Sequence, residues 1–368
     1  MSEKKMKILF FLGHPAQFHV FKNTAVCLEE KGHDVHFVIK QKDILESLLI
    51  NSGFSYSVIR KKERSRSSRL GLMVSLLKMD VNMFRYLRKN KPDVLVGTYI
   101  DLLVRLTKTP LIAVNEDDAS VVPLYARLAY PGAAAILNPV FCNSGKWDKK
   151  AIKYDSYQKM AYLHPNRFVP DRKIVDKYIS SERPYFLLRF AKLNAHHDSG
   201  AHGISTDIAQ KLIDQLEPYG DIYITSERDL EPQFEKYRLQ INPLDIHHIM
   251  AFAKLYIGDS QSMAVEAAML GTPSVRFNDF AGKIGVLEEL EHKYRLTFGI
   301  ATSQPEKLYE TIDFLLKQDD LKEEFQKRRH VMLSDKIDLT AFMTWFIENY
   351  PDSRTIMKNN PDYQYIFR

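Results

Sequence analysis

The sequence of 368 residues lacks the motifs that mark several large classes of enzyme. It contains no G-x-x-x-x-G-K-[ST] phosphate loop, no convincing G-x-G-x-x-G turn and no G-x-S-x-G nucleophile elbow. These absences argue against a kinase, a dehydrogenase and a serine hydrolase. An Asp-x-Asp motif is also missing, which argues against nucleotide-sugar chemistry that depends on a bound metal ion.

Cysteine is scarce, and long hydrophobic runs are missing. The two cysteines, Cys27 and Cys142, form neither a disulfide framework nor a metal-binding spacing, which favours a reducing compartment and predicts a cytoplasmic protein. An apolar run at residues 6–13 follows a basic start. It is too short for a transmembrane helix and lacks a small-residue cleavage site, so we interpret it as the first buried strand.

The excess of positive charge is modest. A formal net charge of +6 favours an anionic ligand or surface, but it is too small and too dispersed to predict a nucleic-acid partner. Hydrophobic residues make up 45% of the chain and charged residues 27%, which is typical of a soluble globular protein with a buried core. The length predicts two domains.

Apolar runs alternate with helical spacing in the first half of the chain. Residues 6–13 read as a strand, residues 18–31 as a helix that ends before a glycine, and residues 33–39 as a second strand. Further strands are predicted at residues 91–99 and 110–116. This alternation predicts a parallel sheet built from βαβ units.

The same pattern restarts after residues 166–184, a charged stretch with two prolines. New strands are predicted at residues 185–190, 221–226, 253–258 and 274–277. The chain is therefore predicted to be α/β, with two doubly wound, Rossmann-like parallel sheets in domains 1–175 and 176–368. Ligands bind at the carboxyl ends of such strands, so we expect the site in a central cleft that both domains face.

The segment YIGDSQSMAVEAAMLGTPSVRF, residues 256–277, is predicted to bind an anion. A strand leads into Asp259 and Ser260, where a helix begins, and exposed N–H groups at a helix start attract negative charge. Glu266 lies one turn beyond Ser262, where its carboxylate could accept hydrogen bonds from paired hydroxyls such as those of a ribose. In the alternative interpretation Asp259 or Ser260 only caps the helix and Glu266 is solvated.

This segment resembles the nucleotide-sugar signature of GT-B-fold enzymes, and it is most similar to that of UDP-N-acetylglucosamine 2-epimerase. The resemblance implies that Ser260 and Ser262 hold a diphosphate and that Glu266 holds the ribose hydroxyls. In this chain Gln261 and Ser262 replace two glycines of the motif. Their side chains could narrow the approach to the phosphate or supply new donors, so Gln261 is included in the predicted site.

Residues 13–38 resemble the opening of the N-acetylglucosaminyltransferase that completes the lipid-linked peptidoglycan precursor. The segments His19-Val20-Phe21 and Gly32-His33-Asp34-Val35 match in register, whereas His14-Pro15-Ala16-Gln17 replaces the glycines of that enzyme's loop. The resemblance implies a nucleotide-sugar contact for Gly13 and His14. It places His19 at a helix start, where an imidazole could act as general base toward an acceptor hydroxyl. Packing of His19 against Phe18 or Phe21 is the alternative.

The loop at residues 191–205 holds three histidines, an aspartate and two glycines. A metal site is not predicted, because neighbouring histidines on a loop rarely converge without further ligands. We expect Arg189 and backbone N–H groups to contact a diphosphate instead, with His196 and His197 close by. With residues 162–171 and the first loop, this loop resembles a prokaryotic family described only as a domain of unknown function. The resemblance covers most of the chain and implies a GT-B fold without a settled reaction.

Two further segments allow more than one interpretation. Glu116 is a catalytic candidate, because a strand-end glutamate in a comparable region of the epimerase does acid–base work, while Asp117 and Asp118 could cap the next helix and Asp101 is a weaker candidate. Residues 60–91 are basic and then amphipathic, which suits contact with an anionic membrane surface. A charged loop followed by an ordinary domain helix is the alternative interpretation, and the favoured one.

The sequence thus predicts a metal-independent glycosyltransferase that takes a UDP-sugar as substrate and needs no cofactor. Its acceptor would be a glycan or a lipid-linked sugar in surface polysaccharide or glycoconjugate synthesis, at the inner face of the membrane if residues 60–91 contact lipid. A UDP-sugar 2-epimerase or its hydrolysing relative is the first alternative, and it needs a carboxylate such as Glu116 near the sugar. A non-catalytic nucleotide-sugar binder is the second.

Overall fold

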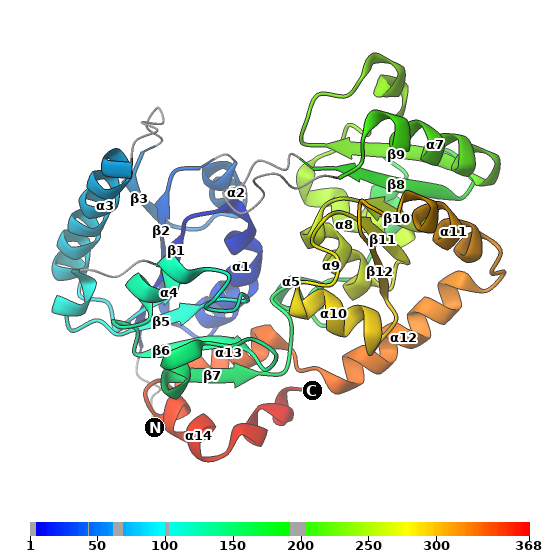
Figure 1. Cartoon of the computed structure of the whole chain (residues 1–368). Helices are drawn as coiled ribbons and strands as arrows, with labels where there is room; N and C mark the ends of the chain where they lie inside the picture. The colour runs from blue at the N-terminus through cyan, green and yellow to red at the C-terminus, as the bar shows by residue number, and fades with distance from the viewer. Residues whose placement is uncertain (1–4, 43, 62–68, 100–102, 192–202) are drawn as a thin grey trace. The chain divides into compact units, whose positions relative to one another are not determined.

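The computed structural model describes residues 5–42, 44–61, 69–99, 103–191 and 203–368, apart from the side chains of residues 69–73 (Figure 1). The chain forms two compact units. The first contains residues 1–162 and 336–368, and the second contains residues 163–335.

The first unit is built on a seven-stranded parallel sheet with the order β3-β2-β1-β4-β5-β6-β7. Its central strands are buried over their whole length or nearly so, which explains their continuous apolar sequence. The strands are β1 (Lys7–Leu12), β2 (Asp34–Lys40), β3 (Tyr56–Arg60), β4 (Val94–Gly97), β5 (Leu111–Val114), β6 (Ala135–Pro139) and β7 (Ala151–Tyr154).

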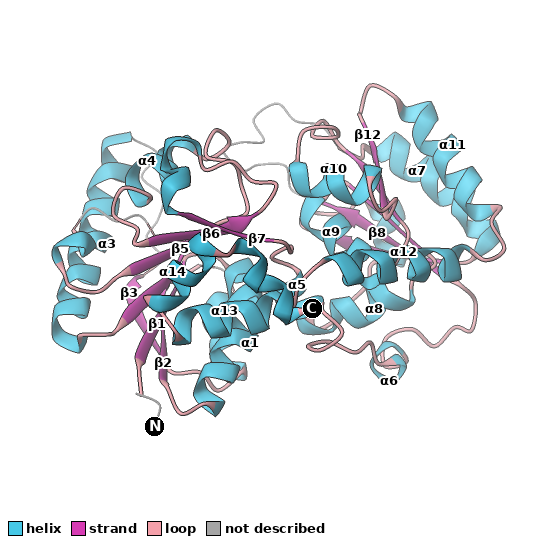
Figure 2. Ribbon diagram, turned by 90° about the horizontal axis from the view of Figure 1, so that it is seen from below, coloured by secondary structure: helices cyan, strands magenta, loops and turns pink. Residues whose placement is uncertain are grey.

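Helices cover both faces of this sheet (Figure 2). Residues of α3 and α4 join one buried core with the strands, and α1 packs with α2 and α13 on the other face. The helices are α1 (Pro15–Glu30), α2 (Leu45–Asn51), α3 (Arg69–Asn90), α4 (Pro123–Ala129), α13 (Leu339–Glu348) and α14 (Asp352–Asn359). The short helix α5 (Met160–Leu163) spans the point in the sequence where the first unit ends and the second begins.

The C-terminal segment belongs to the first unit, which differs from the division at residues 175 and 176 expected from the sequence. Helix α13 is apolar, packs against α1 of the first unit, and buries Phe342 and Phe346. Thr340 donates a hydrogen bond to the carbonyl of Ala161 (2.7 Å). Burial of these apolar side chains therefore attaches the C-terminal segment to the first unit. The repeated βαβ pattern in the sequence does not indicate this attachment.

The second unit holds a five-stranded parallel sheet with the order β12-β11-β10-β8-β9. Its strands are β8 (Tyr185–Phe190), β9 (Asp221–Ser226), β10 (Leu255–Gly258), β11 (Ser274–Phe277) and β12 (Thr297–Ile300). Its helices are α6 (Arg172–Val175), α7 (Thr206–Leu216), α8 (Ile246–Phe252), α9 (Gln261–Leu270), α10 (Gly285–His292), α11 (Pro305–Leu316) and α12 (Leu321–Asp335).

Both sheets are doubly wound, as predicted. In the first unit the strand order reverses between β1 and β4, and in the second it reverses between β8 and β10. Ligands of such folds bind outside the carboxyl ends of the strands at this reversal. No helix of the described residues is long and apolar enough to cross a lipid bilayer.

Candidate functional site

The turn between β10 and α9 lies at the reversal point of the second sheet. Ser260 is the N-cap of α9, and its hydroxyl accepts a long hydrogen bond from the N–H of Met263 (3.5 Å). Gln261 and Ser262 form the first helical positions, where backbone N–H groups point out of the helix end. The helix cap of the alternative interpretation is therefore present, and Ser260, not Asp259, forms it. A serine cap leaves the helix end able to receive an anion.

Asp259 binds two backbone N–H groups, one just after β8 and one just before α7. Its carboxylate is buried, with an exposed fraction of 2%, and accepts hydrogen bonds from the N–H of Ala191 (2.6 Å) and of Ile204 (3.2 Å). A Cβ atom at Gly203 would lie 2.5 Å from Oδ2 of Asp259, so only glycine allows this approach. Burial raises the pKa of Asp259, although the two backbone donors act in the opposite direction. The sequence offered Asp259 only as a helix cap, because its partners lie 55 and 68 residues away.

Glu266 lies on α9, one turn beyond Ser262, and its side chain is only 14% exposed. Its Oε2 atom lies 3.5 Å from Nε2 of His247 in α8. Glu266 is therefore not the solvated carboxylate of the alternative interpretation. His247 was not predicted from the sequence, and its only signal there is a pair of histidines in the otherwise apolar run IHHIMAF.

Arg189, the next-to-last residue of β8, lies beside the same turn. A Cβ atom at Gly258 would lie 2.9 Å from Cβ of Arg189, so the ends of β8 and β10 are in close contact. The guanidinium forms an ion pair with Glu227, and its buried Nε has no hydrogen-bond partner among the described residues. Arg189 is thus a cation held at the reversal point of the sheet.

A pocket of about 290 Å³ opens next to Arg189 and the first turn of α9. Its walls combine apolar side chains with two arginines and two hydroxyls. The lining residues are Arg189, Ile224, Thr225, Ser226, Arg238, Leu239, Ile241, Pro243, Ile246 and Met263. An apolar pocket with a few polar groups beside an anion-binding helix end suits a planar group attached to a phosphate.

In the first unit, the loop after β1 starts α1. His14 is the N-cap, and its Nδ1 accepts a hydrogen bond from the N–H of Ala16 (3.2 Å). Oε1 of Gln17 accepts hydrogen bonds from the N–H of Gly13 (2.7 Å) and of His14 (3.2 Å). This capping box uses N–H groups that a phosphate would otherwise bind.

His19 lies in the second turn of α1 and is partly exposed. Its ring lies 5.6 Å from that of Phe18 and 5.5 Å from that of Tyr162, measured between centroids. The alternative in which His19 packs against Phe18 is thus observed. Partial exposure leaves the imidazole accessible as well.

Glu116 follows β5 and is held by two contacts. Oε1 accepts a hydrogen bond from the N–H of Gln158 (2.7 Å), and Oε2 lies 3.1 Å from Nζ of Lys159. Helix α4 has no side-chain cap, so neither Asp117 nor Asp118 caps it; Asp118 instead accepts a hydrogen bond from the N–H of Asn143 (2.6 Å).

The predicted residues therefore form two groups. Arg189, Ser260, Gln261, Ser262 and Glu266 gather at the end of the second sheet, and Gly13, His14 and His19 share the start of α1 in the first unit. Glu116 lies after β5, separated from β1 by β4. His196, His197 and Asp101 lie outside the described residues. Within the described ranges, no group of three His, Cys, Asp or Glu side chains is arranged to hold a metal ion.

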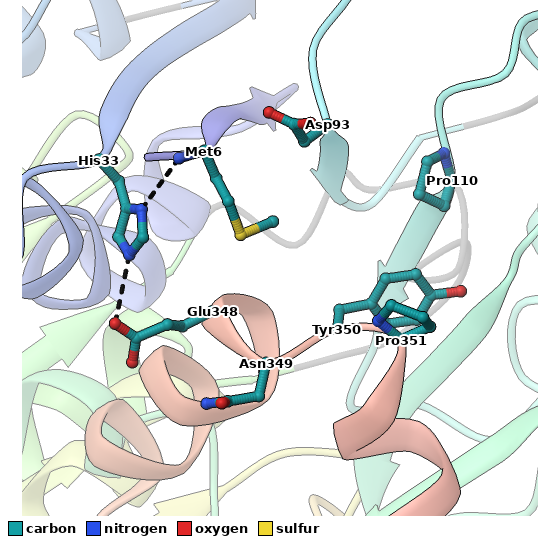
Figure 3. A pocket seen from close by; sticks show the side chains of 8 residues that line it. All are labelled: Met6, His33, Asp93, Pro110, Glu348, Asn349, Tyr350 and Pro351. Atoms are coloured by element: carbon teal, nitrogen blue, oxygen red, sulfur yellow. Dashed lines mark hydrogen bonds and ion pairs between the residues drawn. The ribbon is translucent and has the colours of Figure 1, made fainter. Parts of the chain in front are cut away.

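A second pocket of about 530 Å³ lies at the opposite edge of the first sheet, at the start of its strands (Figure 3). His33 accepts a hydrogen bond from the N–H of Met6 through Nδ1 (3.2 Å), and its Nε2 lies 3.2 Å from Glu348. Asp93 and Tyr350 also line it. No predicted site residue does so, and ligands of doubly wound sheets bind at the other edge.

Comparison with known proteins identifies the family. A model of the family described as a protein of unknown function (DUF354) matches residues 6–286. The chain belongs to this family. This confirms the resemblance seen in the sequence. No curated protein matches the sequence.

Solved structures confirm the GT-B-like fold of this family member. The structure of MnaA from S. aureus with UDP is 14% identical, with a TM-score of 0.65, covering 95% of this chain and 97% of that one. UDP-GlcNAc 2-epimerase from Neisseria meningitidis, bound to UDP-GlcNAc, is 13% identical with a TM-score of 0.66, covering 93% and 100%. The spinosyn rhamnosyltransferase SpnG, complexed with spinosyn aglycone, is 14% identical with a TM-score of 0.58, covering 92% and 100%.

Proposed function

We propose that this protein is a metal-independent glycosyltransferase that uses a nucleotide sugar, with UDP as the nucleotide, and needs no cofactor. One observation supports this most directly: α9 begins at the reversal point of the second sheet, with Arg189 beside it and Glu266 one turn further along. An anion-binding helix end, a cation and a carboxylate are the groups that a diphosphate and a ribose require.

The nucleotide would lie along this edge of the second unit. Its diphosphate would meet the N–H groups of Gln261 and Ser262, and its ribose hydroxyls would meet Glu266. The pocket lined by Leu239, Ile241 and Met263 would receive the base. Two of the similar solved structures contain UDP or UDP-GlcNAc, which supports UDP as the first nucleotide to test.

Transfer would need stabilisation of the departing diphosphate and removal of the acceptor proton. The start of α9 and Arg189 would supply the first, since fixed donors aimed at developing charge lower the barrier. His19 would supply the second as general base. Gly13 and His14, which precede His19 at the start of α1, remain the residues proposed to contact the nucleotide sugar.

The acceptor would be a glycan or a lipid-linked sugar in the synthesis of a surface polysaccharide or glycoconjugate. Helix α3 supports contact with an anionic membrane surface, because Val74 and Leu77 are exposed on it. Arg60, Lys61 and Lys78 line a pocket of about 280 Å³ beside this helix. In this proposal the enzyme is cytoplasmic and acts at the inner face of the membrane.

A UDP-sugar 2-epimerase, hydrolysing or not, is the second candidate. The observation in its favour is Glu116, a strand-end carboxylate held at the first sheet by Gln158 and Lys159. Incubation with UDP-GlcNAc separates the two reactions. Without an acceptor, a new epimer of the sugar nucleotide, or UDP together with the free epimeric sugar, would establish the epimerase. UDP release that depends on an acceptor would establish the transferase.

Thermal-shift measurements over a panel of nucleotides and nucleotide sugars test the site itself. A ligand at 100 times its Kd should stabilise the native state by about 2.7 kcal/mol, and Glu266→Ala should remove most of this shift. Stabilisation without turnover of any kind would establish a non-catalytic binder. A panel without any shift would overturn the nucleotide-sugar proposal.

A further inference from the structure

Two adjacent histidines in α8 differ in what they contact. His247 is buried, with an exposed fraction of 8%, and its Nε2 faces Oε2 of Glu266 in α9. His248 is less buried, and its Nδ1 accepts a hydrogen bond from the N–H of Asp171 (2.9 Å). Phe168 lies next to both rings, with centroids 6.1 Å from His247 and 4.7 Å from His248. Only His247 is therefore directed at the carboxylate predicted to bind a ribose.

His247 and Glu266 meet where both side chains are largely buried from water. The two side chains are 11% and 14% exposed. At 3.5 Å the separation is longer than a normal N–H···O hydrogen bond, so the two atoms are close neighbours that are not within hydrogen-bonding distance. Long contacts of this kind often shorten when a ligand binds.

A contact at Oε2 of Glu266 also sets the direction of its other carboxylate oxygen, Oε1. A glutamate side chain has three rotatable bonds, and free rotation would cost binding energy each time the ligand orders it. A buried histidine that packs beside Phe168 and faces Oε2 of Glu266 would remove part of that freedom before the ligand arrives. The carboxylate can then accept hydrogen bonds from two neighbouring hydroxyls in a preset geometry.

We propose that His247 is a positioning residue that orients Glu266 toward the vicinal hydroxyls of the nucleotide's ribose. This inference rests on the proposed nucleotide-binding function. His247 touches neither the ribose nor the diphosphate, and its effect passes through the Glu266 carboxylate. The site would accordingly select ribonucleotides over 2′-deoxyribonucleotides.

Titration calorimetry with UDP and 2′-deoxy-UDP tests this, using the full chain and its His247→Ala, His248→Ala and Glu266→Ala variants. The wild type should bind UDP about tenfold more tightly than 2′-deoxy-UDP, since one charge-assisted hydrogen bond is lost. His247→Ala should weaken UDP about tenfold and leave 2′-deoxy-UDP nearly unchanged. His248→Ala removes a ring from the same helix and the same Phe168 contact, and it should preserve the preference for UDP.

Equal weakening of both nucleotides by His247→Ala would overturn the inference, because it would show a general structural role. Unchanged UDP binding in that variant would overturn it as well. His247→Gln, which keeps a donor of similar reach, should recover part of the preference if orientation is the cause. Failure of the wild type to bind either nucleotide would overturn the proposed UDP site along with the inference, whereas UDP binding without discrimination would overturn the inference alone.

Discussion

The two units present helix starts of similar position but different chemistry. Each sheet reverses its strand order beside its first strand, and α1 and α9 begin at these two reversal points. At α1, His14 and Gln17 accept the hydrogen bonds of three backbone N–H groups. The first helix start is therefore satisfied by its own side chains.

The start of α9 is not satisfied in this way. Ser260 accepts one long hydrogen bond from Met263, and the described residues supply no acceptor to the N–H groups of Gln261 and Ser262. Helix starts with unsatisfied donors attract anions. We therefore propose that the phosphate binds at the start of α9 in the second unit, while the first unit presents side chains such as His19, and the experiments below test this proposal.

The largest expected effect concerns the first unit. His19→Ala should lower kcat for sugar transfer by about 10²–10⁴-fold, the range for loss of a general base, while UDP affinity stays the same. UDP release from UDP-GlcNAc, with a membrane lipid extract as acceptor source, measures the rate, and calorimetry measures the affinity. Intact transfer in this variant would remove the role of His19. A comparable loss in Glu116→Gln alone would favour the epimerase.

The next effect compares the two helix starts directly. Ser262 and Ala16 occupy the same second helical position in α9 and α1, and both are exposed. A glutamate at either position should leave the helix folded, because acids in the first turn favour the helix dipole. Ser262→Glu should nevertheless weaken UDP binding about 100-fold through repulsion of the diphosphate, or about 2.7 kcal/mol. Ala16→Glu should leave UDP affinity unchanged, and equal losses in both variants would refute the assignment of the phosphate to α9.

The sequence predicted the strands of the second unit better than it predicted the side-chain contacts between them and the helices. Residues 185–190, 221–226 and 274–277 match β8, β9 and β11, because each is a short apolar or β-branched run next to proline, glycine or charged residues. Strands β3, β6, β7 and β12 went unpredicted, since YSVIR, AILNP, AIKY and TFGI are runs of only four or five residues. Local pattern also placed the α9 turn correctly after β10.

Contacts between distant segments explain what the sequence could not show. The hydrogen bonds of Asp259 to Ala191 and Ile204, and the approach of His247 to Glu266, form only when separate βα units pack together. The return of α13 to the first unit has the same origin, because its apolar face does not specify its partner. Periodicity predicts which side of an element is buried, whereas the partner depends on the assembled fold.

A smaller effect tests the anchor of the second unit. Asp259→Asn should lower the free energy of unfolding by about 2 kcal/mol, because the asparagine amide group cannot accept from one of the two backbone N–H groups. The raised pKa of Asp259 means that its contribution is fully present below the unfolded pKa of about 3.9 and is lost as pH rises through the folded pKa. The penalty measured by urea unfolding should thus be larger at pH 4 than at pH 7. A penalty that does not change with pH would contradict the raised pKa.

The smallest effect tests the corresponding anchor of the first unit, where Glu348 of α13 meets Lys31 (2.6 Å) and His33. Burial alone would raise the pKa of Glu348, but the hydrogen bonds from Lys31 and His33 outweigh it and lower the pKa. This contribution is therefore present above the unfolded pKa and lost as pH falls through the folded pKa, opposite to Asp259. Because Lys31 is 46% exposed and screened by solvent, Glu348→Gln should cost only about 1 kcal/mol at pH 7.

Urea unfolding at pH 7 and pH 3 measures this difference, with Glu30→Gln as the control, since Glu30 is exposed near the end of α1. The cost of Glu348→Gln should shrink at pH 3, while Glu30→Gln should cost little at either pH. A cost that persists at pH 3 would show that packing of the side chain stabilises α13, and not its charge. The pH dependence of the unfolding free energy would then no longer distinguish the contribution of Asp259 in the second unit from that of Glu348 in the first.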